Sequence, residues 1–242
     1  MSVDVRRSHD RFHTEIDWLD SWHSFSFSSH YDPANTHHGL LLVNNDDVIR
    51  AGSGFPTHSH QDMEIVTWVL DGELEHRDST GAVGHIYPGL AQRMSAGRGI
   101  RHSEANPSAT QDLHLVQMWV HPDSPGVEPG YEESDLTAEL HRGGLVAVAS
   151  GKDHDGAVHL HQRDATLWAA QLGPGGQVTV PDAPRVHVFV PKGTATLDGA
   201  DGGSALDTGD AARLTEAGTR ALTAGDTGAE VLIWETASGR QH

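Results

Sequence analysis

Hydrophobic and β-branched residues occur along the chain in short runs, each bounded by Gly, Pro, Asn or Asp. Runs of this length with such boundaries are typical of β-strands. Helical periodicity is weak nearly everywhere, and the best helix candidate is Glu132–Glu139, with Ser134 and Asp135 as possible caps. Many short strands joined by turns predict an all-β sandwich or barrel. The predicted strands are Leu40–Val43, Glu64–Leu70, Leu113–Val120, Leu145–Ala149, Thr166–Leu172, Gln177–Val180, Val186–Val190 and Glu230–Trp234.

The two halves of the chain resemble each other. In each half an apolar run enters a Gly turn, at Gly72 and at Gly193, and a second turn follows 17 residues later at Gly89 and 16 residues later at Gly209. We therefore expect a duplicated β-barrel with a first unit at 1–122, a connecting segment at 123–144 and a second unit at 145–242. The alternative is that all-β chains resemble one another at this level without duplication.

Composition narrows the classes of function. Of the 242 residues, 36 % are hydrophobic, which is enough for a core. The chain has 34 Asp and Glu against 16 Lys and Arg, a net charge of −18, so nucleic acid or an anionic membrane surface would repel it. It has no Cys, which excludes disulfides, thiolate metal sites and a Cys nucleophile. No leader or apolar run of spanning length is evident, so we expect a soluble, cytoplasmic protein.

Two pairs among the 19 His residues point to a metal site. His58 and His60 are two positions apart, and so are His102 and Glu104. Side chains at that spacing on a strand point to the same face. If the two strands are neighbours in one barrel, three imidazoles and one carboxylate converge on a single ion. That ligand set suits Fe(II), Mn(II), Ni(II), Cu(II) or Zn(II), and an octahedral ion would keep two positions open.

The apparent duplication provides an internal comparison. In the second half, all five positions that match candidate site residues carry side chains that bind metals poorly. We therefore expect no metal in the second unit. The positions of His58, His60, Glu64, His102 and Glu104 fall on Thr179, Pro181, Arg185, Leu222 and Ala224.

The sequence motifs themselves are distinctive. The stretches HSHQDMEIVTWVLDGELEHRDS at 58–79 and MSAGRGIRHSE at 94–104 closely resemble the pirin family, and WHSFSF at 22–27 is similar to that family's entry motif. The second half looks like the diverged second cupin of the bacterial quercetinase-like branch. The resemblance implies a cupin-superfamily bicupin fold, two jelly-roll-like barrels with one mononuclear metal, often iron. It also implies His58, His60, His102 and Glu104 as the ligands.

The chain departs from the general cupin motif at the carboxylate. Seven residues separate Glu64 from Gly72, where that motif has six. In other cupin branches the glutamate of the first motif is the ligand, so Glu64 and Glu104 compete for this role. We favour Glu104, because its spacing from His102 fixes the geometry and pirin-like proteins use it. Glu64 then orients a ligand or acts as a base, or it lies in solvent at a strand start.

The resemblance implies an oxidoreductase of the quercetin 2,3-dioxygenase type. The expected substrates are dioxygen and a flavonol-like phenol, whose hydroxyl proton Glu64 or Glu104 would accept. Eukaryotic relatives are described as transcriptional co-regulators. The alternatives are therefore a non-enzymatic metal or redox sensor with a protein partner, or a cupin enzyme for another small substrate. The ligand set alone does not separate them.

Overall fold

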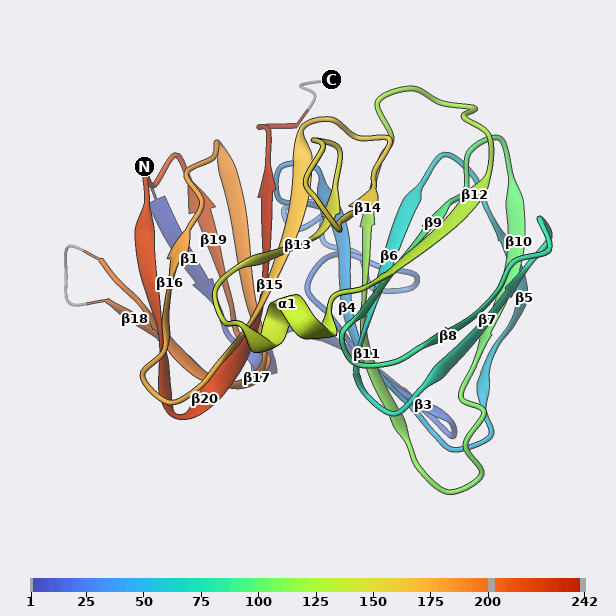
Figure 1. Cartoon of the computed structure of the whole chain (residues 1–242), viewed down its shortest axis with the longest axis horizontal. Coiled ribbons are helices and arrows are strands. Elements are labelled where there is room, and N and C mark those ends of the chain that lie inside the picture. The colour runs from blue at the N-terminus through green and yellow to red at the C-terminus, as the bar shows by residue number, and fades with distance from the viewer. Residues whose placement is uncertain (1, 200–202, 240–242) are drawn as a thin grey trace.

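The computed structural model describes residues 2–199 and 203–239 and shows two β-lobes lying side by side (Figure 1). The first lobe contains a seven-stranded sheet in the order β12-β9-β6-β11-β4-β3-β2 and a four-stranded sheet in the order β5-β10-β7-β8. Its strands are β2 (Phe12–Ile16), β3 (Leu19–His23), β4 (Leu41–Ile49), β5 (Gly54–His60), β6 (Glu64–Asp71), β7 (Leu74–Asp78), β8 (Val83–Ile86), β9 (Leu90–Ser95), β10 (Ile100–Ala105), β11 (Leu113–Val120) and β12 (Gly130–Asp135).

The second lobe is built on a nine-stranded sheet in the order β1-β19-β17-β20-β15-β13-β14, with β16 paired to β20 and β18 paired to β17. The predicted all-β, two-barrel fold class is thus confirmed. The strands of this lobe are β1 (Ser2–Arg6), β13 (Val146–Ser150), β14 (Val158–His159), β15 (Ala165–Leu172), β16 (Gln177–Val180), β17 (Arg185–Leu197), β18 (Ser204–Leu206), β19 (Ala211–Thr215) and β20 (Arg220–Thr236).

Strand β6 is apolar almost throughout because both of its faces are buried. Val66 and Trp68 point into a cluster that is shared with Phe189 and Trp234 of the second lobe. The alternate residue Val69 points into the barrel of the first lobe. The face of a β6 side chain therefore decides whether it lies between the lobes or inside the first barrel.

The helix predicted for Glu132–Glu139 is wrong in its first half. Residues up to Asp135 form β12, which pairs antiparallel with β9, and a short helix α1 (Thr137–His141) follows. The edge of β9 offers hydrogen bonds to the backbone, and this pairing overrides local helix propensity. The predicted cap Asp135 accepts a hydrogen bond from the Thr137 backbone N–H at 2.9 Å.

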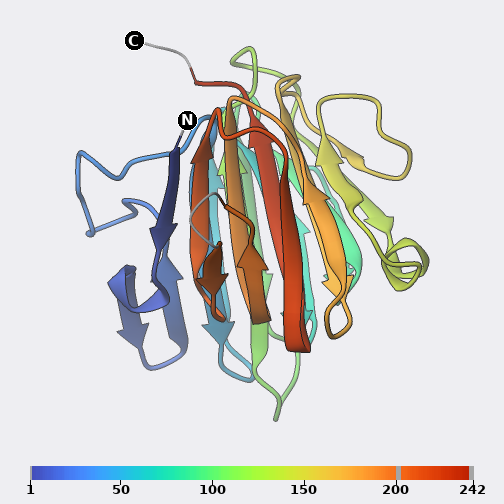
Figure 2. The same ribbon diagram turned by 90° about the vertical axis from the view of Figure 1, so that its left-hand side faces the viewer.

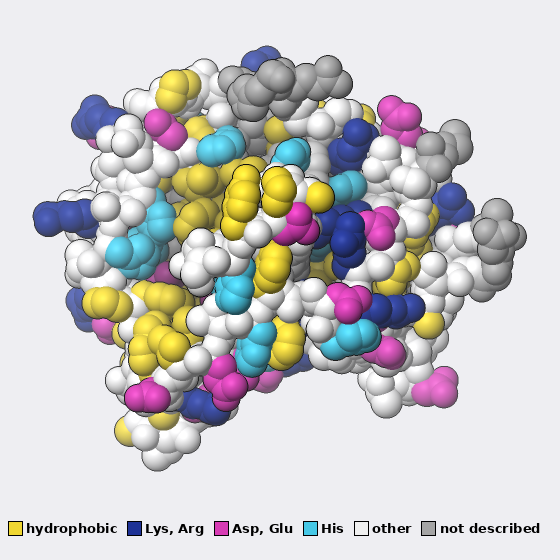
Figure 3. Space-filling view, turned by 180° about the vertical axis from the view of Figure 1, so that it is seen from behind, with side chains coloured by type: hydrophobic (Ala, Val, Ile, Leu, Met, Phe, Trp, Pro, Cys, Tyr) yellow, Lys and Arg dark blue, Asp and Glu magenta, His cyan; other side chains and the backbone are white. Residues whose placement is uncertain are grey.

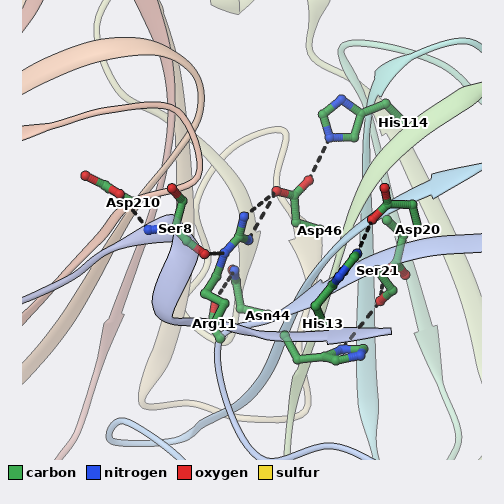
Figure 4. Close-up of polar contacts among 12 residues, drawn as sticks. Ser8, Arg11, His13, Asp20, Ser21, Asn44, Asp46, His114 and Asp210 are labelled. Atoms are coloured by element: carbon green, nitrogen blue, oxygen red, sulfur yellow. Dashed lines mark hydrogen bonds and ion pairs between the residues drawn. The ribbon is translucent and has the colours of Figure 1, made fainter. Parts of the chain in front are cut away.

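The N-terminal segment joins the lobes. Strand β1 pairs with β19 of the second lobe, and the chain then crosses to the first lobe (Figure 2). After the crossing, Arg11 donates to the Ser8 carbonyl at 3.3 Å and to the Asp46 carboxylate at 3.1 and 3.2 Å (Figure 4). Asp46 also contacts His114 Nε2 at 2.6 Å, and Asp210 of the second lobe accepts the Ser8 N–H at 2.7 Å. The crossing is therefore held by partly buried polar contacts at both ends.

Strand pairing crosses the unit boundaries that we expect from the sequence. Those boundaries stay a prediction. β1 lies in the first expected unit but belongs to the sheet of the second lobe, and β12 lies in the expected connecting segment but extends a sheet of the first lobe. Across the part of the chain that the structure describes, no helix has the length and apolar character to cross a membrane.

Candidate metal centre

The two histidine-bearing strands are neighbours. β10 pairs antiparallel with β5, and His102 lies directly opposite His58. His60 is two residues from His58 and so lies on the same face. The register shifts between His102 and Glu104, where Glu104 comes opposite Phe55. The extra residue lies on β5, so β10 keeps its alternation and the side chains of His102 and Glu104 share the buried, inner face.

The three imidazoles converge. The ring centroids lie 4.4 Å apart for His58 and His102, 4.8 Å for His58 and His60, and 5.0 Å for His60 and His102. One ring nitrogen from each lies within 4.8 Å of the others. The structure thus brings together the three histidines that the sequence singled out.

Two of these rings present a free nitrogen toward the centre. His58 Nδ1 lies 2.8 Å from the Pro56 carbonyl, which only accepts, so Nδ1 carries the proton and the Nε2 lone pair is free. His102 Nε2 is buried without a hydrogen-bond partner among the described residues. A buried nitrogen left without a partner is costly unless something else binds it. The donor set therefore fits a divalent transition metal.

Burial keeps two of the imidazoles uncharged. It lowers the pKa of His60 to about 4, and the neighbouring His58 adds to the effect. Burial also lowers the pKa of His102 to about 3, helped by His58, His60 and His76. A metal needs a neutral imidazole, so these rings are ready to bind at neutral pH.

Glu104 provides an oriented carboxylate beside the histidines. Its side chain is buried, and both oxygens accept hydrogen bonds from the Gln117 amide, at 3.1 and 2.9 Å. The Gln117 carbonyl in turn accepts from Trp119 Nε1 at 3.1 Å. Burial raises the pKa of Glu104, and the bonds from Gln117 offset part of this rise. Glu104 is thus a fixed and comparatively basic carboxylate.

A cavity of about 400 Å³ opens beside these groups. Aromatic rings form much of its wall, and Trp119 meets His60 edge-on at 5.0 Å. Figure 3 shows histidine and hydrophobic side chains gathered on the face of the molecule seen from behind. The lining residues are Thr14, Ile16, Trp18, Leu19, Ser21, His23, Phe27, Ser28, Asn45, Asp47, Phe55, Pro56, His58, His60, Glu104, Gln117 and Trp119.

Glu64 does not line this cavity. It lies on the face of β6 that meets the second lobe, where Ser95 Oγ donates to its Oε2 at 3.0 Å and the His161 backbone N–H donates to the same atom at 3.1 Å. The side chain is fully buried. The catalytic role considered for Glu64 stays a prediction, and its position favours Glu104 as the carboxylate of the site.

The sequence motifs do not point to Gln117, Asp47 or Ser21. Gln117 and His114 are the two polar residues in the apolar run of β11, and a polar residue in such a run can indicate a site. Asp47 is buried at the wall of the cavity and accepts a hydrogen bond from Ser21 Oγ. Burial raises the pKa of Asp47 to about 7, with Asp46 and Glu104 adding to the rise. No spacing in the sequence connects Ser21 to Asp47.

The second lobe has an apolar interior at the corresponding strands. β16 pairs with β20, and Leu222 lies opposite Val178. Leu222 and Ala224, the positions aligned with His102 and Glu104, are buried in the apolar cluster of this lobe. Both groups of metal-ligating side chains that the described residues form lie in the first lobe.

Comparison with known proteins gives matches over both halves. Residues 4–120 match the Pirin family model, and residues 147–236 match the model described as the quercetinase C-terminal cupin domain. A Mycobacterium tuberculosis protein named "Putative quercetin 2,3-dioxygenase" is 56 % identical over 235 residues, covering 97 % of this chain and 95 % of the relative. The Escherichia coli protein named quercetin 2,3-dioxygenase is 43 % identical over 196 residues, covering 81 % and 84 %.

Two solved structures extend the comparison. The crystal structure of YhhW from Escherichia coli is similar with a TM-score of 0.89 at 39 % identity, and the match covers 100 % of both chains. A structure described as bacterial pirin YhhW in complex with nickel(II) matches with a TM-score of 0.88 at 38 % identity, over 99 % of this chain and 100 % of that chain.

Proposed function

The chain belongs to the pirin family, and on that premise we propose that its first lobe is a metal-dependent dioxygenase for flavonol-like phenols. The observation that carries the proposal is the convergence of the imidazoles of His58, His60 and His102. Beside them lies an aromatic-lined cavity that Glu104 also lines. In the proposed site one divalent metal is held by His58, His60, His102 and Glu104. We propose Fe(II) as this metal. Ni(II), Mn(II), Cu(II) and Zn(II) fit the same donors.

The metal, when bound, would supply a positive charge that favours a phenolate over a phenol and the redox chemistry with dioxygen. The protein's own residues bind and orient the substrate. Trp119, Phe27 and Phe55 form apolar walls against which a planar ring system can stack.

Proton transfer falls to the carboxylate at the cavity. Glu104 lines the cavity and is held in place by Gln117, so it is the carboxylate that a bound substrate can reach. A substrate hydroxyl at hydrogen-bond distance from Glu104 would lose its proton to this carboxylate. Gln117 keeps the carboxylate in place before and after the transfer.

The test is turnover of quercetin by the metal-loaded protein. The purified chain is loaded in turn with Fe(II), Ni(II), Mn(II) or Cu(II), and the absorbance of quercetin is followed under air. We expect metal-dependent loss of the flavonol band in the wild type and in His85→Gln, a half-exposed histidine on β8. The double variant His58→Ala with His102→Ala should be inactive. Absence of metal-dependent turnover, or full turnover by the double variant, would refute the proposal.

The other functions considered from the sequence use the same metal site and are separated by the same assay. A metal or redox sensor with a protein partner would bind metal and a partner without turning quercetin over. A cupin enzyme for another small substrate would turn over a different compound. The cytoplasmic location expected from the sequence stays a prediction.

A further inference from the structure

A second buried histidine lies behind His102. His76 on β7 is fully buried, its ring centroid is 5.2 Å from that of His102, and the two Nδ1 atoms are 3.5 Å apart. The other ring nitrogen of His76, Nε2, lies 3.2 Å from Asp78 Oδ2. The side chains of His76 and Asp78 are 1 % and 0 % exposed. Asp78, His76 and His102 therefore form a buried hydrogen-bonded series that ends at a proposed metal ligand.

Strand geometry explains this alignment. β7 pairs antiparallel with β10, where Asp78 lies opposite His102 and His76 lies opposite Glu104. His76 and Asp78 are two residues apart and share the inner face with their cross-strand partners. The spacing repeats that of His58 with His60 and of His102 with Glu104.

The carboxylate sets the direction of the hydrogen bonds. Asp78 Oδ1 accepts from the Thr80 backbone N–H at 2.8 Å, from Thr80 Oγ1 at 2.6 Å and from the Ala82 backbone N–H at 3.2 Å. Oδ2 remains for His76, whose Nε2 must carry the proton because a carboxylate only accepts.

With its proton on Nε2, His76 has a lone pair at Nδ1. The facing Nδ1 of His102 then carries a proton and donates a hydrogen bond to His76 Nδ1. The lone pair on His102 Nε2 is left free. This is the same Nε2 that has no hydrogen-bond partner in the described part of the chain and is offered to the metal. A metal-bound histidine gains basicity and a fixed ring orientation from such a donation.

Tyr131 covers the buried His76 side chain. Its ring stacks on His76 with centroids 4.9 Å apart and an interplanar angle of 27°. Tyr131 comes from β12, and it fits only because Gly84 has no side chain, since a Cβ there would lie 1.8 Å from the Tyr131 hydroxyl oxygen. The residues that shield His76 thus come from two further strands, β8 and β12.

We propose that Asp78 and His76 are positioning residues that hold His102 in the tautomer and ring orientation required for metal binding. The proposal rests on the metal site of the proposed function but adds two residues that do not touch the metal. A competing arrangement exists, because His76, His102 and Glu104 also place ligand atoms within 4.8 Å of one another. In that arrangement His76 would itself be a ligand of a second ion.

The experiment measures binding of Co(II) alone to the full chain, by competition with a chromophoric chelator and by the visible spectrum of bound Co(II). The informative change is Asp78→Asn. Its carbonyl can still accept from Thr80 and Ala82, while its NH2 group would face His76 Nε2. That reverses the tautomer of His76, so its Nδ1–H points at His102 and opposes the ligand tautomer.

We expect Asp78→Asn to bind Co(II) about 10- to 100-fold more weakly and to show a shifted Co(II) spectrum. His76→Phe keeps a ring against Tyr131 but offers no acceptor, and it should also bind weakly. His76→Gln offers an amide oxygen to the His102 Nδ1–H and should bind with intermediate affinity. His85→Gln on the neighbouring strand should match the wild type in affinity and spectrum.

The outcomes separate the proposals. If the wild type binds no Co(II), the metal site itself is refuted. If it binds one ion and the variants match it in affinity and spectrum, only the positioning role is refuted. Two ions in the wild type and one in both His76 variants would replace it with the two-metal arrangement. Should Asp78→Asn fail to fold, the graded order of wild type, His76→Gln and His76→Phe decides the question.

Discussion

The side-chain amide of Gln117 donates to both oxygens of the Glu104 carboxylate, at 3.1 and 2.9 Å, on the inner face of the first barrel. A carboxylate that is buried beside three histidines needs such a donor when no cation is present. Gln117 therefore supports the folded protein as well as the proposed site.

We predict that Gln117→Leu lowers the free energy of unfolding of the metal-free protein by about 1–3 kcal/mol, because Glu104 loses its donor. Urea unfolding followed by tryptophan fluorescence measures this change. The control is Gln177→Leu at the exposed end of β16, where loss of the bond to Thr223 should have little effect. Equal stability of the two variants would contradict the prediction.

The two candidate carboxylates lie in different places. Glu104 faces the cavity of the first barrel, whereas Glu64 lies on the face of β6 that meets the second lobe. We predict that Glu104→Gln lowers the affinity for Fe(II) by about tenfold or more and abolishes turnover. Glu64→Gln should retain both, because its amide oxygen can still accept from Ser95 and His161 between the lobes. Metal titration and quercetin turnover of the two variants provide the test. Loss of metal binding in Glu64→Gln alone would reverse the assignment.

His38 makes stability depend on pH. Burial lowers its pKa to about 4, and the Leu214 carbonyl offsets part of the shift. Between pH 6.5 and 4 the unfolded state then binds more protons at this residue than the folded state, so stability falls as the pH falls.

From pH 7.5 to pH 5, this contribution of His38 amounts to about 2 kcal/mol. We predict that His38→Gln, which cannot titrate, loses correspondingly less stability over that interval than the wild type. Urea unfolding at the two pH values measures both losses. The expectation fails if the wild type and the variant lose equal amounts.

The ion pair between Arg11 and Asp46 is almost fully buried, with side chains 8 % and 12 % exposed. We predict that Arg11→Met lowers the free energy of unfolding by about 3 kcal/mol, because among the described residues Asp46 then keeps only its hydrogen bond with His114. The matched control is Arg6→Met, which breaks an exposed pair with Asp4 and should cost less than about 1 kcal/mol. Urea unfolding measures the stability of both variants. Similar losses of stability would show that the burial of the ion pair is not what determines its contribution.

The alternation of side chains on strands allowed the metal-ligating pairs of the site to be predicted from the sequence. An i, i+2 pair shares a face whatever the strand packs against, so His58 with His60 and His102 with Glu104 were identifiable as pairs. The apolar runs likewise predicted the buried strands β6, β11 and β15. The same alternation joins His76 to Asp78, a pair that no motif in the sequence marks out.

The tertiary structure decided what depends on contacts between distant segments. The docking of the two lobes brought His161 to Glu64, and the pairing of β10 with β5 and β7 put Glu104 at the cavity. Spacing along the chain gives neither of these neighbours. The open edge of β9 made a strand of residues expected to be helical. Local sequence sets which side chains share a face, but the register and packing of strands far apart in the chain set what each face meets.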